Sequence, residues 1–195
     1  MTQEHYFIDF EASSLSGQSY PVEVAWSCED GTIESHLINP YHIQEWTDWA
    51  PDSQAVHGLS RKQLALEGES PHTVARRMNE ALEGKTLLCD GYDMDFHWLY
   101  TLFKATHLEM RFKLGDAIHI FLSEIKSEPG LSDVMAGKPV DLTPKRLILS
   151  DIRNECWSHI DNRHRAAEDV QHHMMTWEAI KDHNRSLNSA SFSYK

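Results

Sequence analysis

A hydrophobic stretch near the start of the chain, residues 6–15 (YFIDFEASSL), carries two carboxylates, Asp9 and Glu11, separated by a single residue. The stretch is predicted to form a β-strand, in which successive side chains point to opposite faces of the sheet. Ile8 and Phe10 therefore share one face, and Asp9 and Glu11 share the other with Phe7. Like charges side by side on a half-buried surface repel each other, and burying them unpaired is costly. Either the strand has its polar face in water, or a cation lies between the carboxylates.

Length and composition fit an ordinary globular protein. The chain has 195 residues, of which 41% are hydrophobic and 25% charged, and such proportions are typical of single domains. We expect one domain over residues 1–184 and a polar C-terminal tail over residues 185–195. No segment is apolar enough to span a bilayer, and residues 1–10 lack a basic region followed by a hydrophobic one. We therefore expect a cytoplasmic protein without a membrane partner.

The net charge of −12 argues against a nucleic-acid binder that relies on a broad basic surface. It does not exclude an enzyme that engages one strand end through bound metal. The three cysteines are widely spaced and form no C-x-x-C pair, so neither a disulfide framework nor a zinc knuckle is indicated.

The order of the expected elements describes an α/β fold with a mixed sheet flanked by helices. Asp30-Gly31 is a strong hairpin signal, so the first three strands should be antiparallel. Ser and Gly bracket two helices as caps. We expect strands over 5–12, 21–30, 32–40, 86–91 and 111–117, and helices over 60–68, 70–84, 94–106, 143–158 and 164–184.

Helical spacing selects one carboxylate from the acidic segment after the fourth strand, residues 89–103 (CDGYDMDFHWLYTLF). Positions three, four, seven and eight residues after Asp95 are all apolar and include Trp98, which we expect to pack in the core. The same steps from Asp93 give a mixed face. We therefore expect Asp95 at the buried end of this helix, and Asp93 facing solvent or capping it.

The last expected helix contributes a further pair, His164 and Asp169, near its start. Both side chains could border the same cleft as Asp9 and Glu11. They could equally be a capping residue and an exposed carboxylate. Taken alone, the pair does not decide between these readings.

Together these positions resemble the motifs of the DnaQ-like 3′–5′ exonucleases of the DEDDh subgroup, over residues 5–175. The resemblance implies an RNase H-like fold with a five-stranded mixed sheet. Residues 55–64 (AVHGLSRKQL) also resemble the H-G-[IL]-[ST] segment of that family. The matching positions are Asp9 and Glu11 in the first motif, Asp95 in the second, and His164 with Asp169 in the third. The chain departs from the pattern at Gly91, where the second motif usually has Asn, and in a longer insert at 118–160.

The resemblance implies a metal-dependent exonuclease that releases 5′-mononucleotides from the 3′ end of single-stranded RNA or DNA. An all-carboxylate site with open positions suits two Mg²⁺ or Mn²⁺ ions, one to activate water and one to stabilise the leaving oxygen. By resemblance, Asp9 would bridge both ions, and Glu11 and Asp169 would help hold one. Asp95 would act from the other side. His164 fits the general base, because an ordinary histidine pKa suits that work at neutral pH.

The terminal nucleotide would lie, again by resemblance, against four positions: Ala12, Ser13, Ser14 and His57. Dimers are common among relatives, and the sequence leaves a homodimer open. It also leaves the choice between RNA and DNA open. Two other functions are compatible with the same residues: a phosphohydrolase acting on nucleotides or another phosphate ester, and a family member that binds nucleic acid without cutting it.

Overall fold

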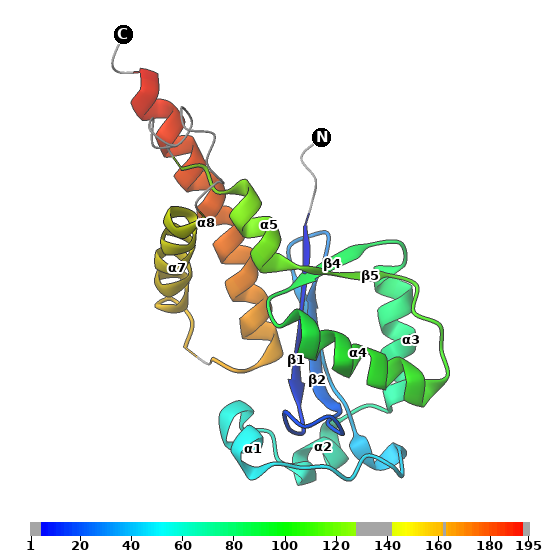
Figure 1. Ribbon diagram of the computed structural model, residues 1–195. Coiled ribbons are helices and arrows are strands. Elements are labelled where there is room, and N and C mark those ends of the chain that lie inside the picture. The colour runs from blue at the N-terminus through cyan, green and yellow to red at the C-terminus, as the bar shows by residue number, and fades with distance from the viewer. Residues whose placement is uncertain (1–4, 128–141, 162, 193–195) are drawn as a thin grey trace. The chain divides into compact units, whose positions relative to one another are not determined.

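The computed structural model describes residues 5–127, 142–161 and 163–192 (Figure 1). The chain forms two compact units, one from residues 1–117 with 162–171 and the other from residues 118–161 with 172–195. The boundary that we expected at residue 184 stays a prediction.

The first unit is built on a five-stranded mixed sheet with the strand order β3-β2-β1-β4-β5. The first three strands pair antiparallel, as expected, whereas β4 pairs parallel with β1 and β5 parallel with β4. This confirms the predicted α/β fold with a mixed sheet. The strands are β1 (Tyr6–Ala12), β2 (Pro21–Ser27), β3 (Ile33–Leu37), β4 (Thr86–Cys89) and β5 (Lys113–Asp116).

The turn between β2 and β3 forms at the expected Asp30-Gly31 pair. Gly31 has a φ of +81°, a conformation that glycine adopts without steric cost. The Asp30 carboxylate accepts hydrogen bonds from the backbone N–H and the hydroxyl of Thr32, at 3.0 and 2.6 Å. Local turn chemistry therefore fixes the register of this hairpin.

The helices α2 (Arg61–Glu67) and α3 (Pro71–Leu82) begin at the predicted caps. The side chains of Ser60 and Ser70 each accept a hydrogen bond from the backbone N–H three residues further on, both at 3.1 Å. The short helices η1 (Pro40–His42) and α1 (Pro51–His57) were not expected. We missed α1 because it begins without a side-chain cap.

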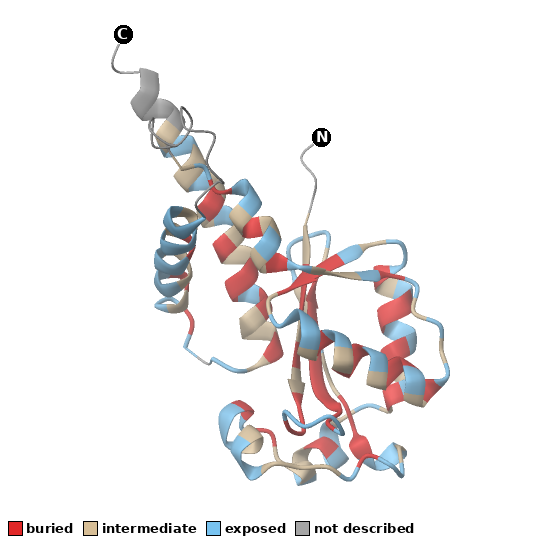
Figure 2. Cartoon of the chain, in the orientation of Figure 1, coloured by how far each residue is buried: buried red, intermediate tan, exposed pale blue. Residues whose placement is uncertain are grey.

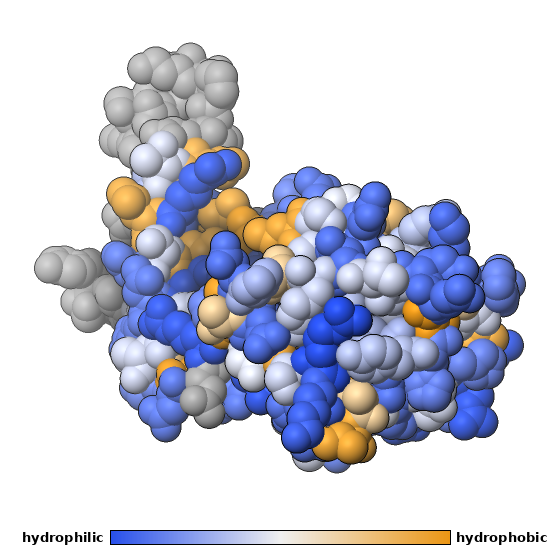
Figure 3. Space-filling view, turned by 90° about the horizontal axis from the view of Figure 1, so that it is seen from below, coloured by the Kyte–Doolittle hydropathy of each residue, from blue (hydrophilic) through white to orange (hydrophobic). Residues whose placement is uncertain are grey.

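The helix α4 (Tyr92–Thr106) packs against β1 and β2 and against α3. Its apolar stripe from Trp98 onward is buried, as predicted, and the Trp98 indole donates a hydrogen bond to Ser19 Oγ at 2.8 Å. The core between sheet and helices includes Ile8 and Phe10, and β2 is buried along its whole length (Figure 2). One face of β1 is therefore covered by helices. The right-hand part of the view in Figure 3 is mostly hydrophilic.

The second unit contains α5 (Ala117–Glu124, which begins at the last residue of the first unit), α7 (Thr143–Trp157) and most of α8 (Ala166–Phe192). The helix expected over 143–158 is confirmed. We did not expect α5, and α8 continues beyond residue 184, where we expected the last helix to end. Within this unit Asn184 bonds the end of α5: its Nδ2 donates to the carbonyl of Glu124 at 2.9 Å. Residues 128–141 of the predicted insert lie outside the described part of the chain.

No helix among the described residues has both the length and the apolar character needed to cross a bilayer.

Candidate functional site

Three carboxylates from two distant segments meet on the second face of β1. Oxygen atoms of Asp9, Glu11 and Asp169 all lie within 4.8 Å of one another, and the three side chains are half-buried. Alternation along β1 puts Asp9 and Glu11 on this face, and the first turns of α8 supply Asp169. The structure thus brings together three of the predicted site residues in an arrangement that could hold a metal ion.

The carboxylates of this cluster repel one another when they are ionised. Burial raises the pKa of Asp9 well above its ordinary value, and the nearby carboxylates of Asp95 and Asp169 raise it further. Burial and the charge of Asp169 raise the pKa of Glu11 to about 8. Without a cation, these carboxylates are therefore held next to one another at a cost in free energy.

Asp95 lies at the start of α4 with an exposed fraction of 3%, whereas Asp93 is exposed, as helical spacing predicted. The backbone N–H of Asp95 donates to the carbonyl of Gly91 at 2.9 Å. A Cβ at Gly91 would lie 3.2 Å from Asp95 Oδ2. The departure from the usual Asn therefore leaves room for the Asp95 carboxylate to fold back over the chain.

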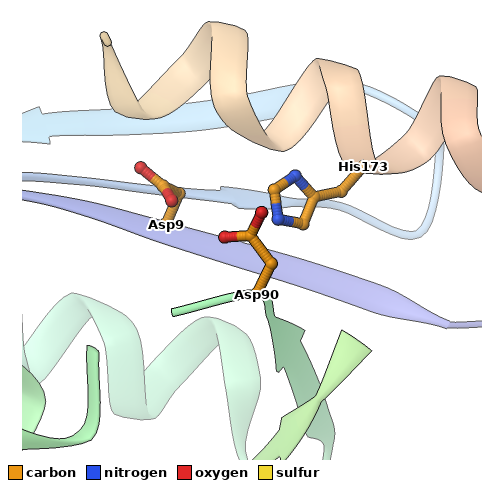
Figure 4. Close-up of side chains that lie close together, drawn as sticks. All are labelled: Asp9, Asp90 and His173. Carbon is orange, nitrogen blue, oxygen red and sulfur yellow. The ribbon is translucent and has the colours of Figure 1, made fainter. Parts of the chain in front are cut away.

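Asp90 belongs to the acidic segment after the fourth strand, from which helical spacing selected only Asp95. It follows β4 directly, and one of its carboxylate oxygens lies within 4.8 Å of an Asp9 carboxylate oxygen (Figure 4). Because β4 pairs parallel with β1, the residue after β4 comes to lie beside the middle of β1. A signal in the sequence did exist, since Asp90 stands at the end of a buried strand.

The segment before α8 is anchored to the sheet by an ion pair between the half-buried Arg165 and the buried Glu23. Arg165 donates two hydrogen bonds to the Glu23 carboxylate, from Nε at 2.9 Å and from NH2 at 2.8 Å. The backbone N–H of Ala166 donates a third, at 3.2 Å. Glu23 is 2% exposed and lies opposite Glu11 in the pairing of β1 with β2. The pair thus fixes the segment that carries Asp169 next to the strand that carries Glu11.

His164 immediately precedes this anchor. It is exposed, and its φ of +65° is unusual for a residue other than glycine. Among the described residues, the close cluster of carboxylates around Asp9 does not include it. Its predicted role as a general base stays a prediction.

The predicted nucleotide-binding positions at the end of β1 and directly after it, Ala12, Ser13 and Ser14, are buried. A bulge between Glu11 and Ala12 ends the regular pairing with β2. The backbone N–H of Ser13 donates to the carbonyl of Tyr20 at 3.0 Å, and the Ser14 hydroxyl donates to the Asp48 carboxylate. These bonds hold the turn that follows the acidic pair, and their relation to a nucleotide stays a prediction.

His57 ends α1 and is buried, with an exposed fraction of 4%. Its Nδ1 accepts the backbone N–H of Leu59 at 3.0 Å, so the neutral ring carries its proton on Nε2. Burial lowers its pKa, although Glu23 and the backbone of Ala12 oppose the shift. His57 therefore lies near the end of β1 as a neutral side chain.

No family model matches the sequence, and no curated protein matches it. Solved structures of exonuclease I are similar in fold. A zinc-bound form of the E. coli enzyme with single-stranded DNA is 13% identical with a TM-score of 0.64, over 98% of this chain and 43% of that one. The E. coli enzyme with a dT13 oligonucleotide is 13% identical with a TM-score of 0.63, over 96% and 43%. A moderately thermophilic exonuclease I from Methylocaldum szegediense is 15% identical with a TM-score of 0.57, over 86% and 38%.

The chain therefore spans less than half the length of these exonuclease I chains. At such low identity the similarity concerns the fold, and it confirms the RNase H-like fold that the sequence motifs implied.

Proposed function

We propose that this chain is a metal-dependent 3′–5′ exonuclease that hydrolyses the terminal phosphodiester bond of single-stranded nucleic acid. The observation that carries the proposal is the convergence of Asp9, Glu11 and Asp169 with the neighbouring charges of Asp90 and Asp95. A half-buried group of carboxylates with raised pKa values destabilises a fold unless it binds cations. Such a group is therefore more consistent with a metal site than with a structural role.

The residues present fit a hard divalent cation. All of the clustered first-unit ligands are carboxylates, which suit Mg²⁺ or Mn²⁺. Asp9, Glu11 and Asp169 would hold such an ion, with Asp95 and Asp90 approaching from the side of β4 and α4. Two bound ions would supply an activated water and stabilise the leaving 3′-oxygen.

The protein itself would supply a general base and hold it in position relative to the attacking water. We assign His164 the role of taking a proton from the attacking water on an imidazole nitrogen. Its exposed position suits a group that must meet both water and substrate. The ion pair between Glu23 and Arg165 limits how far His164 can move, because it holds the next residue against the sheet.

The proposed substrate class is compatible with the same geometry. A phosphodiester brings its own negative charge into an acidic site, so it can bind only together with cations. The turn at Ala12, Ser13 and Ser14 lies directly after Glu11 and would receive the terminal nucleotide. Similarity in fold to exonuclease I bound to dT13 favours single-stranded DNA, and the same site would accept RNA.

The test is cleavage of oligonucleotides labelled at the 5′ end. Purified protein is incubated with single-stranded DNA and RNA in Mg²⁺, in Mn²⁺ and in EDTA. We expect a ladder that shortens from the 3′ end, release of 5′-monophosphates, and no cleavage in EDTA. An Asp169→Asn variant is the negative control and an Asp93→Asn variant the matched positive control. Mid-chain products, or hydrolysis of free nucleotides alone, would contradict the proposal and favour a phosphohydrolase.

A further inference from the structure

The outer side of α4 carries aromatic residues where a helix of this kind usually carries polar ones. Tyr92, Phe96 and Tyr100 follow one another at intervals of four residues and have exposed fractions of 39%, 44% and 56%. Lys104 continues the same exposed row. The inner side of α4 already fills the core, so these three rings are not needed to bury the helix.

The rings are aligned with one another. The centroids of Tyr92 and Phe96 are 6.2 Å apart and those of Phe96 and Tyr100 are 6.5 Å apart, and in both pairs the planes differ by 17°. The Lys104 ammonium lies 5.8 Å from the Tyr100 ring centroid. The result is a row of nearly parallel aromatic faces that ends in a cation. We call these four residues the aromatic row.

A groove of about 380 Å³ runs beside the aromatic row. Phe96 and Tyr100 line it, and its two side chains able to carry positive charge are Lys104 and His107. The lining contains no carboxylate, although the chain has 30 acidic residues against 18 Lys and Arg. In an acidic protein, a groove whose lining combines aromatic rings with the Lys104 ammonium and contains no carboxylate is complementary to an anionic ligand with flat rings.

We propose that the aromatic row binds single-stranded nucleic acid, with bases stacked on Tyr92, Phe96 and Tyr100 and a phosphate near Lys104. Stacking on aromatic rings beside a positive groove is the usual way in which proteins hold single strands without regard to sequence. The row starts in the same helical turn as Asp95 and spans thirteen residues from Tyr92 to Lys104, a rise of about 18 Å along the helix. It would therefore hold nucleotides upstream of the terminal one. This inference rests on the proposed function for its direction along the strand.

Binding is measured first, in EDTA, so that the outcome does not depend on cleavage. Fluorescence anisotropy follows a fluorescein-labelled oligothymidylate dodecamer with the wild type and with Phe96→Ala and Tyr100→Ala. Removal of one stacking ring should weaken binding at least about five-fold. Phe96→Trp should restore affinity, because it restores a stacking face. Leu66→Ala is the matched control, since Leu66 is a 74% exposed hydrophobic residue on α2.

Lys104→Gln tests the phosphate contact separately. The slope of log affinity against log salt should become shallower by about one unit, because one fewer counterion is released. Melting curves of every variant establish that the fold is intact. Unchanged dodecamer affinity in both alanine variants would overturn the proposal.

Cleavage then separates this proposal from the proposed function. The ratio of kcat/KM for a dodecamer to kcat/KM for a dinucleotide should fall in Phe96→Ala and Tyr100→Ala, because a dinucleotide is too short to reach along the row. If the wild type cleaves neither substrate but the alanine variants lose affinity, the exonuclease proposal fails and the aromatic row stands. If the alanine variants keep affinity but convert a dimer to a monomer in sedimentation velocity, the row is a contact between copies of the chain and the proposal fails.

Discussion

The two faces of β1 differ in what they contribute to the protein. Ile8 and Phe10 on one face are buried in the core against α3 and α4. Asp9 and Glu11 on the other face have raised pKa values, because burial and like charges disfavour their ionised forms. The first face therefore stabilises the fold, whereas the two carboxylates on the second face destabilise the metal-free protein. Because side chains alternate between the two faces of a strand, one short strand can contribute both to the core and to the acidic cluster. We expect a substitution on one face to have little effect on the other.

The largest expected effect comes from removing one charge of the acidic face. Asp9→Asn or Asp169→Asn should lower the hydrolysis rate by several orders of magnitude, because the metal loses a ligand. The same change should raise the melting temperature of the metal-free protein, since it relieves repulsion. Both are measured on the same samples, by oligonucleotide cleavage and by thermal melting in EDTA. Undiminished cleavage by Asp9→Asn would remove the basis for the metal site.

A second prediction tests the orientation of α4. Asp95→Asn should reduce activity by several orders of magnitude, because Asp95 is buried beside Asp9. Asp93→Asn should leave activity close to that of the wild type, since Asp93 is exposed. The two carboxylates are two residues apart, which makes each the control for the other. A reversal of the two effects would mean that the functional carboxylate is Asp93.

A third prediction concerns His164. A general base typically contributes about 10² to 10⁴-fold in rate, so His164→Ala should slow hydrolysis within that range while metal affinity, measured by Mn²⁺ titration, changes little. The wild-type rate should fall as pH drops and the imidazole is protonated, and this limb should flatten in the variant. Arg165→Lys should give an intermediate loss, because a lysine cannot make both bonds to Glu23. If His164→Ala keeps full activity and an unchanged pH profile, His164 is not the general base.

A fourth prediction examines the apolar face. Ile8 is fully buried, so Ile8→Ala should lower the free energy of unfolding by about 2–5 kcal/mol, and Ile8→Val by about 0.5–1.5 kcal/mol. The activity of the folded fraction should remain near that of the wild type, because the side chain points away from the carboxylates. Urea denaturation measures the free energy of unfolding, and oligonucleotide cleavage measures the activity. A large loss of activity in Ile8→Val would show that the two faces are not independent.

The sequence predicted the sheet and most helices because their signals are local. Alternation gave β1, an Asp-Gly pair gave the β2–β3 turn, and serine caps gave α2 and α3. Helical spacing separated Asp95 from Asp93 for the same reason. The helix α1 was missed because no capping side chain marks its start.

The parts of the site that were missed depend on contacts between distant segments. Asp90 lies near Asp9 because β4 pairs with β1, and no pattern in the sequence specifies which strands become neighbours. The Glu23–Arg165 pair joins residues 142 positions apart in the chain. Glu23 reads as an ordinary polar residue of an alternating strand, and only the fold reveals that it is buried and paired. Family resemblance supplied the motif positions, but not the contacts that hold them.

A last prediction concerns the pH dependence of stability in the metal-free protein. The pKa of Glu11 is raised from its ordinary 4.5 to about 8 in the folded state. Between these values the folded protein keeps a proton that the unfolded chain has lost, so stability should fall as pH rises through this window and level off above it. Melting in EDTA from pH 4.5 to 9 measures the slope. Glu11→Gln should reduce it, Asp93→Asn should not, and saturating Mg²⁺ should flatten the wild-type curve, because a bound cation replaces the proton. A slope that survives in both Glu11→Gln and Asp9→Asn would mean that the acidic face of β1 does not differ from the apolar face in the way proposed.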